Sequence, residues 1–226
     1  FIESKRTTAT GASSGYSSDA VRELLDWCQH FNDKQAKLLD KPLYSPGELG
    51  SVINEIALIG VDLAVRRPIY DWLQKKLTKS QKKSISHEEI DSDAFEKLAK
   101  EWSRLCKSTG YDVLDKYSYV LKRWNSFETR RLKLNDWMES NNLKVNALGG
   151  PFLQDAIKES KRIEEDLVLQ HSELESLKLE CKQIMELKET ECPELKVTDS
   201  EMNILLADLE CLESTLKCAI LEKIEK

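Results

Sequence analysis

The chain has 226 residues, of which 33% are charged, and its formal net charge is −6. This acidic balance gives no electrostatic reason to expect a nucleic-acid partner. No apolar run approaches the roughly 20 residues that a membrane-spanning helix needs, and no signal-peptide core is present. Many leucines, glutamates and lysines with few glycines are typical of long helices and coiled coils, and the length allows one or two domains.

The cysteines lack the spacing of a disulfide framework or of a C-x-x-C motif, which predicts reduced thiols in a cytoplasmic or nuclear compartment. The six are Cys28, Cys106, Cys181, Cys192, Cys211 and Cys218. The chain begins without an initiator methionine and stops within a helical pattern, so we expect a piece of a longer protein.

The first fifty residues predict a leader, a helix and a turn. Residues 1–16 are polar, small and aperiodic, and we expect a disordered leader there. A helix follows, which the polar residues 17–19 can cap and which ends before Pro42. The segment 42–50 has two prolines and two glycines and predicts a turn.

The second helix has apolar residues along one face over 49–77. Pro68 lies inside this pattern and should kink the helix or end its first half. A polar connection is predicted over 75–93. Within it, Ser86 and Glu89 have the spacing of a capping box for the next helix.

The stretch 91–148 is the longest helical pattern in the chain. It has no proline, and its large apolar residues return every three or four positions. It predicts one amphipathic helix about 80 Å long, which two bundles can share. A weak point is expected over 107–110, since Thr109 and Gly110 are poor helix formers. A bend or a frayed turn is predicted there.

The remaining residues predict two more helices. The segment 146–151 carries two glycines and a proline, which end the long helix and open the next. An apolar stripe then runs over 153–184, and Pro193 turns the chain. Thr198 and Glu201 have capping-box spacing before the last helix.

Helices with one apolar stripe must bury it against one another. We therefore predict an all-α fold of two tandem three-helix bundles, joined by the shared long helix. After the leader, the first bundle is expected over 17–122 and the second over 123–226.

Two parts of this pattern echo each other. Leu25-Asp26-Trp27 is matched by Asn135-Asp136-Trp137, and each tryptophan precedes a proline-bearing turn. Together with the bridging helix, this long period resembles the spectrin repeat, in a divergent form of the dystrophin, nesprin or anchoring-scaffold type.

The resemblance implies core positions for four tryptophans. Trp27 and Trp137 take the position in the first helix of each repeat, Trp102 takes the position in the third helix of the first repeat, and Trp124 falls near the junction. It also implies a non-enzymatic scaffold within a larger cytoskeletal or membrane-anchored linker protein. The implied partners are cytoskeletal proteins such as actin, nuclear-envelope proteins or adaptor proteins, and the implied location is cytoplasmic, at the cytoskeleton or the nuclear envelope.

An alternative hypothesis is a homodimerising coiled-coil module, in which the same stripes pair between chains. No catalytic residue, metal ligand or cofactor site is predicted. Paired carboxylates on such helices are typical of solvated faces, and the histidines and cysteines lack zinc-site spacing.

A cluster of lysines is the most concentrated charge feature. Its members are Lys75, Lys76, Lys79, Lys82 and Lys83. One interpretation is a set of exposed lysines favoured by the dipole of a helix C-terminus. The other is a contact for an acidic partner, such as actin, tubulin or anionic lipid.

Apolar residues supply further candidate contacts. Phe127 and Leu134 lie near the predicted junction, where we expect a partner or a hinge. Other apolar residues lie off the stripes and fit either a partner groove or dimer seam, or a broad core face, which we favour. These are Ile69, Val168, Leu169 and Leu179.

Overall fold

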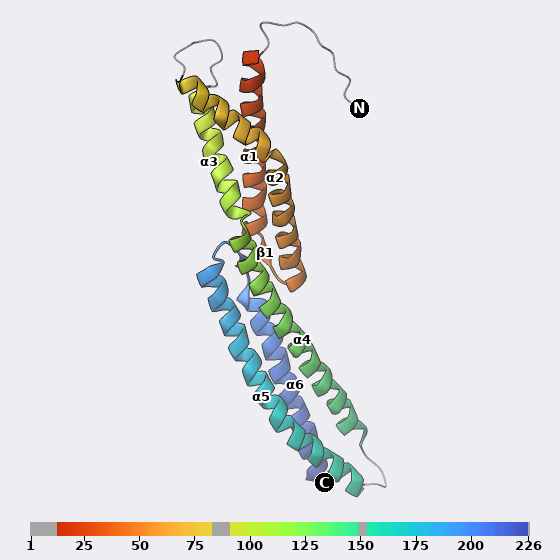
Figure 1. Cartoon of the computed structure of the whole chain (residues 1–226). Coiled ribbons are helices and arrows are strands. Elements are labelled where there is room, and N and C mark those ends of the chain that lie inside the picture. The colour runs from red at the N-terminus through yellow and green to blue at the C-terminus, as the bar shows by residue number, and fades with distance from the viewer. Residues whose placement is uncertain (1–12, 83–90, 149–152, 226) are drawn as a thin grey trace, which may run out of the picture. The chain divides into compact units, whose positions relative to one another are not determined.

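The computed structural model describes residues 13–82, 91–148 and 153–225. Within these residues the fold is all-α, as predicted, apart from two strands of two residues each (Figure 1). The helices are α1 (Ser13–Asp40), α2 (Pro46–Lys82), α3 (Ser92–Ser108), α4 (Tyr111–Ala147), α5 (Leu153–Glu191) and α6 (Asp199–Ile224). The strands are β1 (Pro42–Leu43) and β2 (Lys196–Val197).

The chain divides into two compact units. The first unit is Phe1–Lys41 with Ser51–Asp115, and the second is Pro42–Gly50 with Lys116–Lys226. The connection between α1 and α2 therefore belongs to the second unit, although both helices belong mainly to the first. The division predicted after residue 122 falls inside α4.

The first helix begins earlier than predicted. Residues 13–16 are helical rather than part of a leader, and residues 1–12 lie outside the described residues. Ser17 is buried, and its hydroxyl accepts a 2.6 Å hydrogen bond from Lys76 Nζ on α2. Ser17 thus ties two helices of the first unit together instead of capping α1.

All three helices of the first unit contribute side chains to one apolar cluster, which includes Cys28 of α1, Leu63 of α2 and Leu98 of α3. Trp102 is buried in it, with Tyr70 stacked on its ring at a centroid distance of 4.5 Å. The remaining buried members are Val21, Leu24, Ile59, Leu73, Phe95 and Leu105. Shape-complementary burial of this kind is what stabilises a helix with one apolar stripe.

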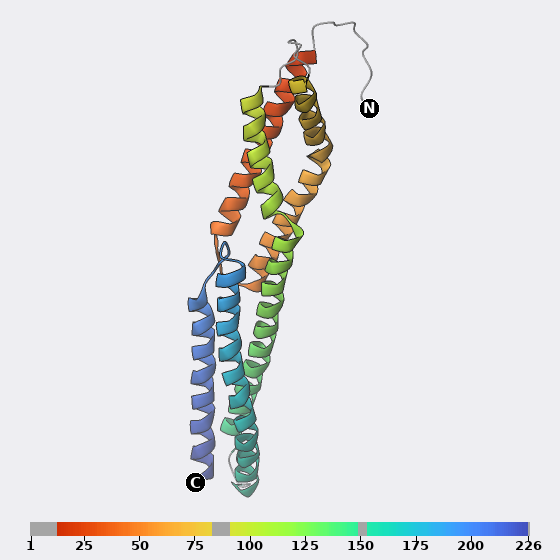
Figure 2. The same ribbon diagram turned by 60° about the vertical axis from the view of Figure 1, so that its left-hand side comes forward.

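Pro68 lies inside α2 and does not end it. Proline removes one backbone donor from a helix and kinks it, and α2 is curved along its length (Figure 2). Beyond the proline, Tyr70, Leu73 and Leu77 pack on the cluster and hold the helix in place. The helix reaches Lys82, so the polar connection predicted from residue 75 is shorter than expected.

The long helix predicted over 91–148 is two helices. The weak point expected at 107–110 is confirmed, because α3 ends at Ser108 and the Gly110 carbonyl then accepts the first backbone bonds of α4, from Val113 and Leu114, both at 3.1 Å. A Cβ built on Gly60 of α2 would lie 3.6 Å from Thr109, so these two backbones approach closely.

The start of α3 differs from the prediction. Asp91 is its N-cap and accepts backbone hydrogen bonds from Asp93 and Ala94. An aspartate at this position satisfies donors that the first helical turn leaves unpaired. The predicted capping pair of Ser86 and Glu89 lies outside the described residues.

Helices of the second unit also share an apolar cluster. Val145 comes from α4, Ile163 and Leu167 from α5, and Leu216 and Ile220 from α6. Of the four tryptophans for which the resemblance implies core positions, Trp102 and Trp124 are buried. Trp27 and Trp137 are partly buried and pack against the two clusters.

In the last helix, Met202, Leu206 and Leu209 are buried and belong to its core face. Thr198 occupies the N-cap position, but its side chain makes no capping hydrogen bond, so the predicted capping box does not form. The glycines and the proline expected to separate α4 from α5 lie outside the described residues.

The two short strands pair in parallel within the second unit, which the sequence pattern does not predict. Pro42 is opposite Lys196 and Leu43 is opposite Val197. The Thr198 amide donates to the Leu43 carbonyl at 3.3 Å, and both Leu43 and Val197 are buried. The predicted turn is therefore partly a strand, and α2 begins within it at Pro46.

Candidate protein-binding surface

Helix α2 carries apolar side chains on two faces. One face lies in the core, while a second row, spaced three, four, four and three residues apart, is exposed. Its members are Leu58, Val61, Val65, Ile69 and Trp72, and between 42% and 69% of the surface of each residue is exposed. We call this row the outer face of α2. A continuous exposed apolar row of this length is a candidate site of association.

One border of the outer face is also apolar. At about 100° per residue, Ala57, Ala64 and Pro68 fall beside the row on one side. The uncharged surface thus spans 57–72, about 24 Å along the helix axis. Small residues on this border allow another backbone to come close.

The opposite border is charged and tied to the first unit's own helices. The Arg66 guanidinium lies over the Trp27 ring, 4.4 Å from its centroid, and 3.8 Å from the Asp62 carboxylate. Glu55 forms a 3.0 Å ion pair with Lys34 of α1. These contacts hold the charged side chains beside the apolar row.

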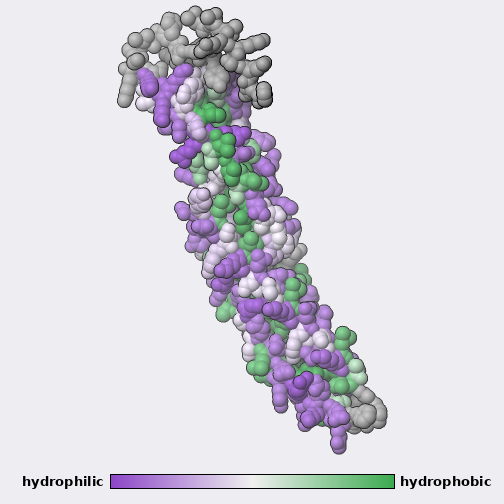
Figure 3. Space-filling view, turned by 45° about the vertical axis from the view of Figure 1, so that its right-hand side comes forward, coloured by the Kyte–Doolittle hydropathy of each residue, from purple (hydrophilic) through white to green (hydrophobic). Residues whose placement is uncertain are grey.

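Trp72 stands between two surface hollows. The larger, about 720 Å³, is lined by Asp19 and Glu23 of α1 together with Ile69 and Trp72 of α2. The smaller, about 460 Å³, lies on the other side of Trp72, next to Ala64. Figure 3 shows hydrophobic (green) side chains gathered in a band along the first unit, with hydrophilic (purple) ones beside them.

The predicted lysine cluster continues from the C-terminal end of this face. Lys75, Lys76 and Lys79 lie on α2 and not in a loop. The Lys76 ammonium is 5.2 Å from the centroid of the Trp72 ring, besides its bond to Ser17. The side chains of the two remaining lysines, Lys82 and Lys83, lie outside the described residues.

The predicted contacts at Phe127 and Leu134 are wrong as surface positions. Both side chains are buried within the second unit. Their spacing places them on the apolar stripe of α4, where they face the core. A charge at Leu134 is therefore expected to unfold this unit rather than to block a surface.

The apolar residues off the stripes are exposed, which corrects the broad core face that we favoured. Ile69 belongs to the outer face of α2, and Val168, Leu169 and Leu179 lie exposed on α5. The core closes on the narrower stripe alone, so these side chains remain available to another molecule.

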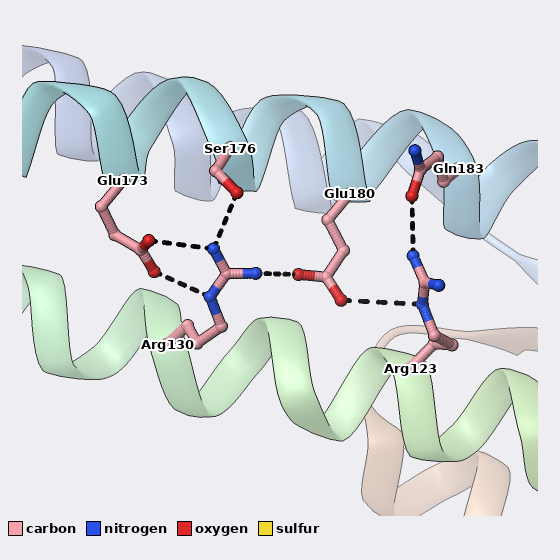
Figure 4. Close-up of polar contacts among 6 residues, drawn as sticks. All are labelled: Arg123, Arg130, Glu173, Ser176, Glu180 and Gln183. Atoms are coloured by element: carbon pink, nitrogen blue, oxygen red, sulfur yellow. Dashed lines mark hydrogen bonds and ion pairs between the residues drawn. The ribbon is translucent and has the colours of Figure 1, made fainter.

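A polar ladder joins α4 to α5 in the second unit (Figure 4). Arg130 binds Glu173 with both a 2.7 Å and a 3.0 Å hydrogen bond, and also binds Glu180. Arg123 lies 3.6 Å from the same Glu180 and donates to Gln183 at 2.8 Å. The hydrogen bond to Glu173 raises the pKa of Arg130, which keeps its charge at any physiological pH. The ladder pairs opposite charges and holds two helices together.

Within the described ranges no group of three or more His, Cys, Asp or Glu side chains could hold a metal ion. Burial raises the pKa of Cys28 to about 12 and that of Cys192 to about 11, so both thiols stay protonated at neutral pH. No helix in the described part of the chain has an apolar stretch long enough to cross a membrane.

Comparisons with known proteins identify no family. No protein-family model matches the chain, and neither the curated proteins nor the solved structures give a significant match. The function must therefore be inferred from the surface itself.

The outer face of α2 was visible in part in the sequence. Ile69 was recognised as lying off the core stripe, but the four residues that share its face were not. The available signal was the segment from Ala57 to Trp72, in which apolar residues fill positions on two sides of one helix.

Proposed function

We propose that this chain is a non-enzymatic, protein-binding scaffold, and that its first unit docks a partner on the outer face of α2. The observation that carries the proposal is the unbroken exposed row from Leu58 to Trp72 on a helix whose opposite face is already buried. A helix that is apolar on both sides is stable in water once both sides are covered.

The energetics favour a helical partner. Fully burying a leucine, valine or isoleucine side chain contributes about 1.5–3 kcal/mol, and the row offers four of these residues. Trp72, with a hollow on each side, has the shape of an anchor residue, since tryptophan is enriched among the residues that dominate binding energy. A helix that lays an apolar row along α2 matches this arrangement.

The architecture that we propose for the scaffold is a pair of spectrin-like three-helix units. Its support is the adjacency of Trp27 on α1 and Trp102 on α3, whose ring centroids lie 6.5 Å apart, and the apolar cluster that three helices share in each unit. By the same resemblance, the chain belongs to a larger linker protein of the cytoplasm, and its partners are cytoskeletal, nuclear-envelope or adaptor proteins.

Site-specific photocrosslinking tests the docking function. A photoreactive phenylalanine analogue is placed at Val65, in the middle of the outer face, and separately at Lys97, an exposed polar position on α3. After irradiation in an extract, we expect covalent protein adducts from position 65 and few from position 97. Equal yields from both positions, or none from position 65, would remove the outer face of α2 as a binding surface.

A further inference from the structure

We infer that the occupant of the outer face of α2 is a second copy of this chain, packed antiparallel through its own α2. This inference rests on the proposed function, because it requires the outer face to be a docking surface. It adds the identity of the partner and the register of the contact.

The spacing of the exposed row is symmetric about Val65. Leu58 and Trp72 are equally far from it in sequence, and so are Val61 and Ile69. In an antiparallel pair with a two-fold axis at Val65, Leu58 meets Trp72 of the other copy, Val61 meets Ile69, and Val65 meets itself. This is the self-complementarity that a two-fold interface requires, and docking of an unrelated helix does not require it.

The charged border is complementary in the same register. Arg66 of one copy lies on the same border as Asp62 of the other, two residues or about 3 Å from level, and Lys76 lies one residue from level with Glu55. Each of these pairings occurs twice by symmetry, and each brings opposite charges together. A parallel pair in register would instead place Asp62 against Asp62 and Arg66 against Arg66, which is repulsive.

The other border allows the two helices to approach. Ala64 of one copy lies two residues, or about 3 Å, from level with Pro68 of the other, and both side chains are uncharged and short. The Asp62 and Arg66 side chains already lie beside the row in one copy, held by their own 3.8 Å ion pair and by the Trp27 ring. Pairing therefore extends an existing charge network and leaves no new buried charge without a partner.

The size of the face sets the expected strength. A strip about 24 Å long buries an area at the low end for specific interfaces. We therefore expect a dissociation constant on the order of micromolar. About half of the chains are paired when the total concentration equals the dissociation constant. The experiment is therefore done at concentrations from below to well above this range.

Disulfide trapping tests the register. The background is Cys211→Ser with Cys218→Ser, because these two cysteines are exposed. In it, Val65→Cys is expected to give a covalent dimer under mild oxidation. A mixture of Leu58→Cys and Trp72→Cys chains is expected to give a mixed dimer, while each of these two alone gives little. Leu143→Cys, at an exposed position on α4, is the matched control.

Each outcome decides the inference. Dimers from Val65→Cys and from the mixture, well above the Leu143→Cys control, support it. Strong cross-linking of Leu58→Cys with itself would show a parallel pair and overturn the register. No trapping above the control overturns self-docking, and photocrosslinked adducts to other proteins at position 65 would then leave the proposed function standing. If neither disulfide trapping nor photocrosslinking at position 65 exceeds its control, both self-docking and the proposed docking function are contradicted.

Discussion

Trp102 connects the core of the first unit to the border of the outer face of α2. Its ring stacks on Tyr70 and lies near Trp27, and Trp27 in turn carries Arg66 over its face. Aromatic pairs of this kind add about 0.5–1.5 kcal/mol beyond the area that they bury. Arg66 sits at the charged border of the outer face of α2, so the same aromatic group that fills the core also places a surface charge.

We predict that Trp102→Ala lowers the free energy of unfolding of the first unit by about 3–5 kcal/mol, because it leaves a large cavity in the core. Urea denaturation followed by circular dichroism measures this loss. Trp72→Ala removes the same side chain from the exposed face and is the matched control, with an expected change of less than about 1 kcal/mol. Equal losses in the two variants would contradict the assignment of Trp102 to the core.

At the scale of elements, the pairing of β1 with β2 ties two connections that are far apart in the sequence. Leu43 and Val197 are buried at this pairing, and the segment Pro42–Gly50 belongs to the second unit. The connection between α1 and α2 is therefore a structural part of the second unit and not a free turn.

We predict that Leu43→Ala destabilises the second unit by about 2–4 kcal/mol, because the side chain is buried and its loss leaves a cavity. Native-state hydrogen exchange resolves the effect by helix. Amides of α5 and α6 should exchange faster in the variant, while those of α1 and α3 change little. Faster exchange confined to α1 and α3 would show that the connection stabilises the first unit instead.

At the scale of the whole molecule, local patterns predicted well what depends on local sequence. The apolar stripes and the weak point at 107–110 follow from periodicity and from residue preferences. The placement of Trp27 beside Trp102 followed from the resemblance to a known repeat. The start of α1 was missed because Ser17 bonds to Lys76, a residue far along the chain.

Features that depend on distant residues were not predictable in this way. The ladder from Arg130 to Glu173 and Glu180 joins residues 43 and 50 positions apart, and nothing local marks their alignment. The pairing of β1 with β2 also joins segments that are far apart in the sequence, so local sequence did not predict it. The outer face of α2 was missed for another reason: periodicity selects one apolar face per helix, and here a second one is present.

The central claim is that α2 has two apolar faces with different roles, one in the core and one for a partner. Chemical denaturation of two matched variants tests it most directly, at a concentration below the micromolar range so that self-association does not contribute. We predict that Val65→Glu changes the free energy of unfolding by less than about 0.5 kcal/mol, whereas Ile59→Glu, with its carboxylate forced into the core, lowers it by more than about 3 kcal/mol. A loss for Val65→Glu as large as that for Ile59→Glu would show that the outer face is part of the core and would contradict the account.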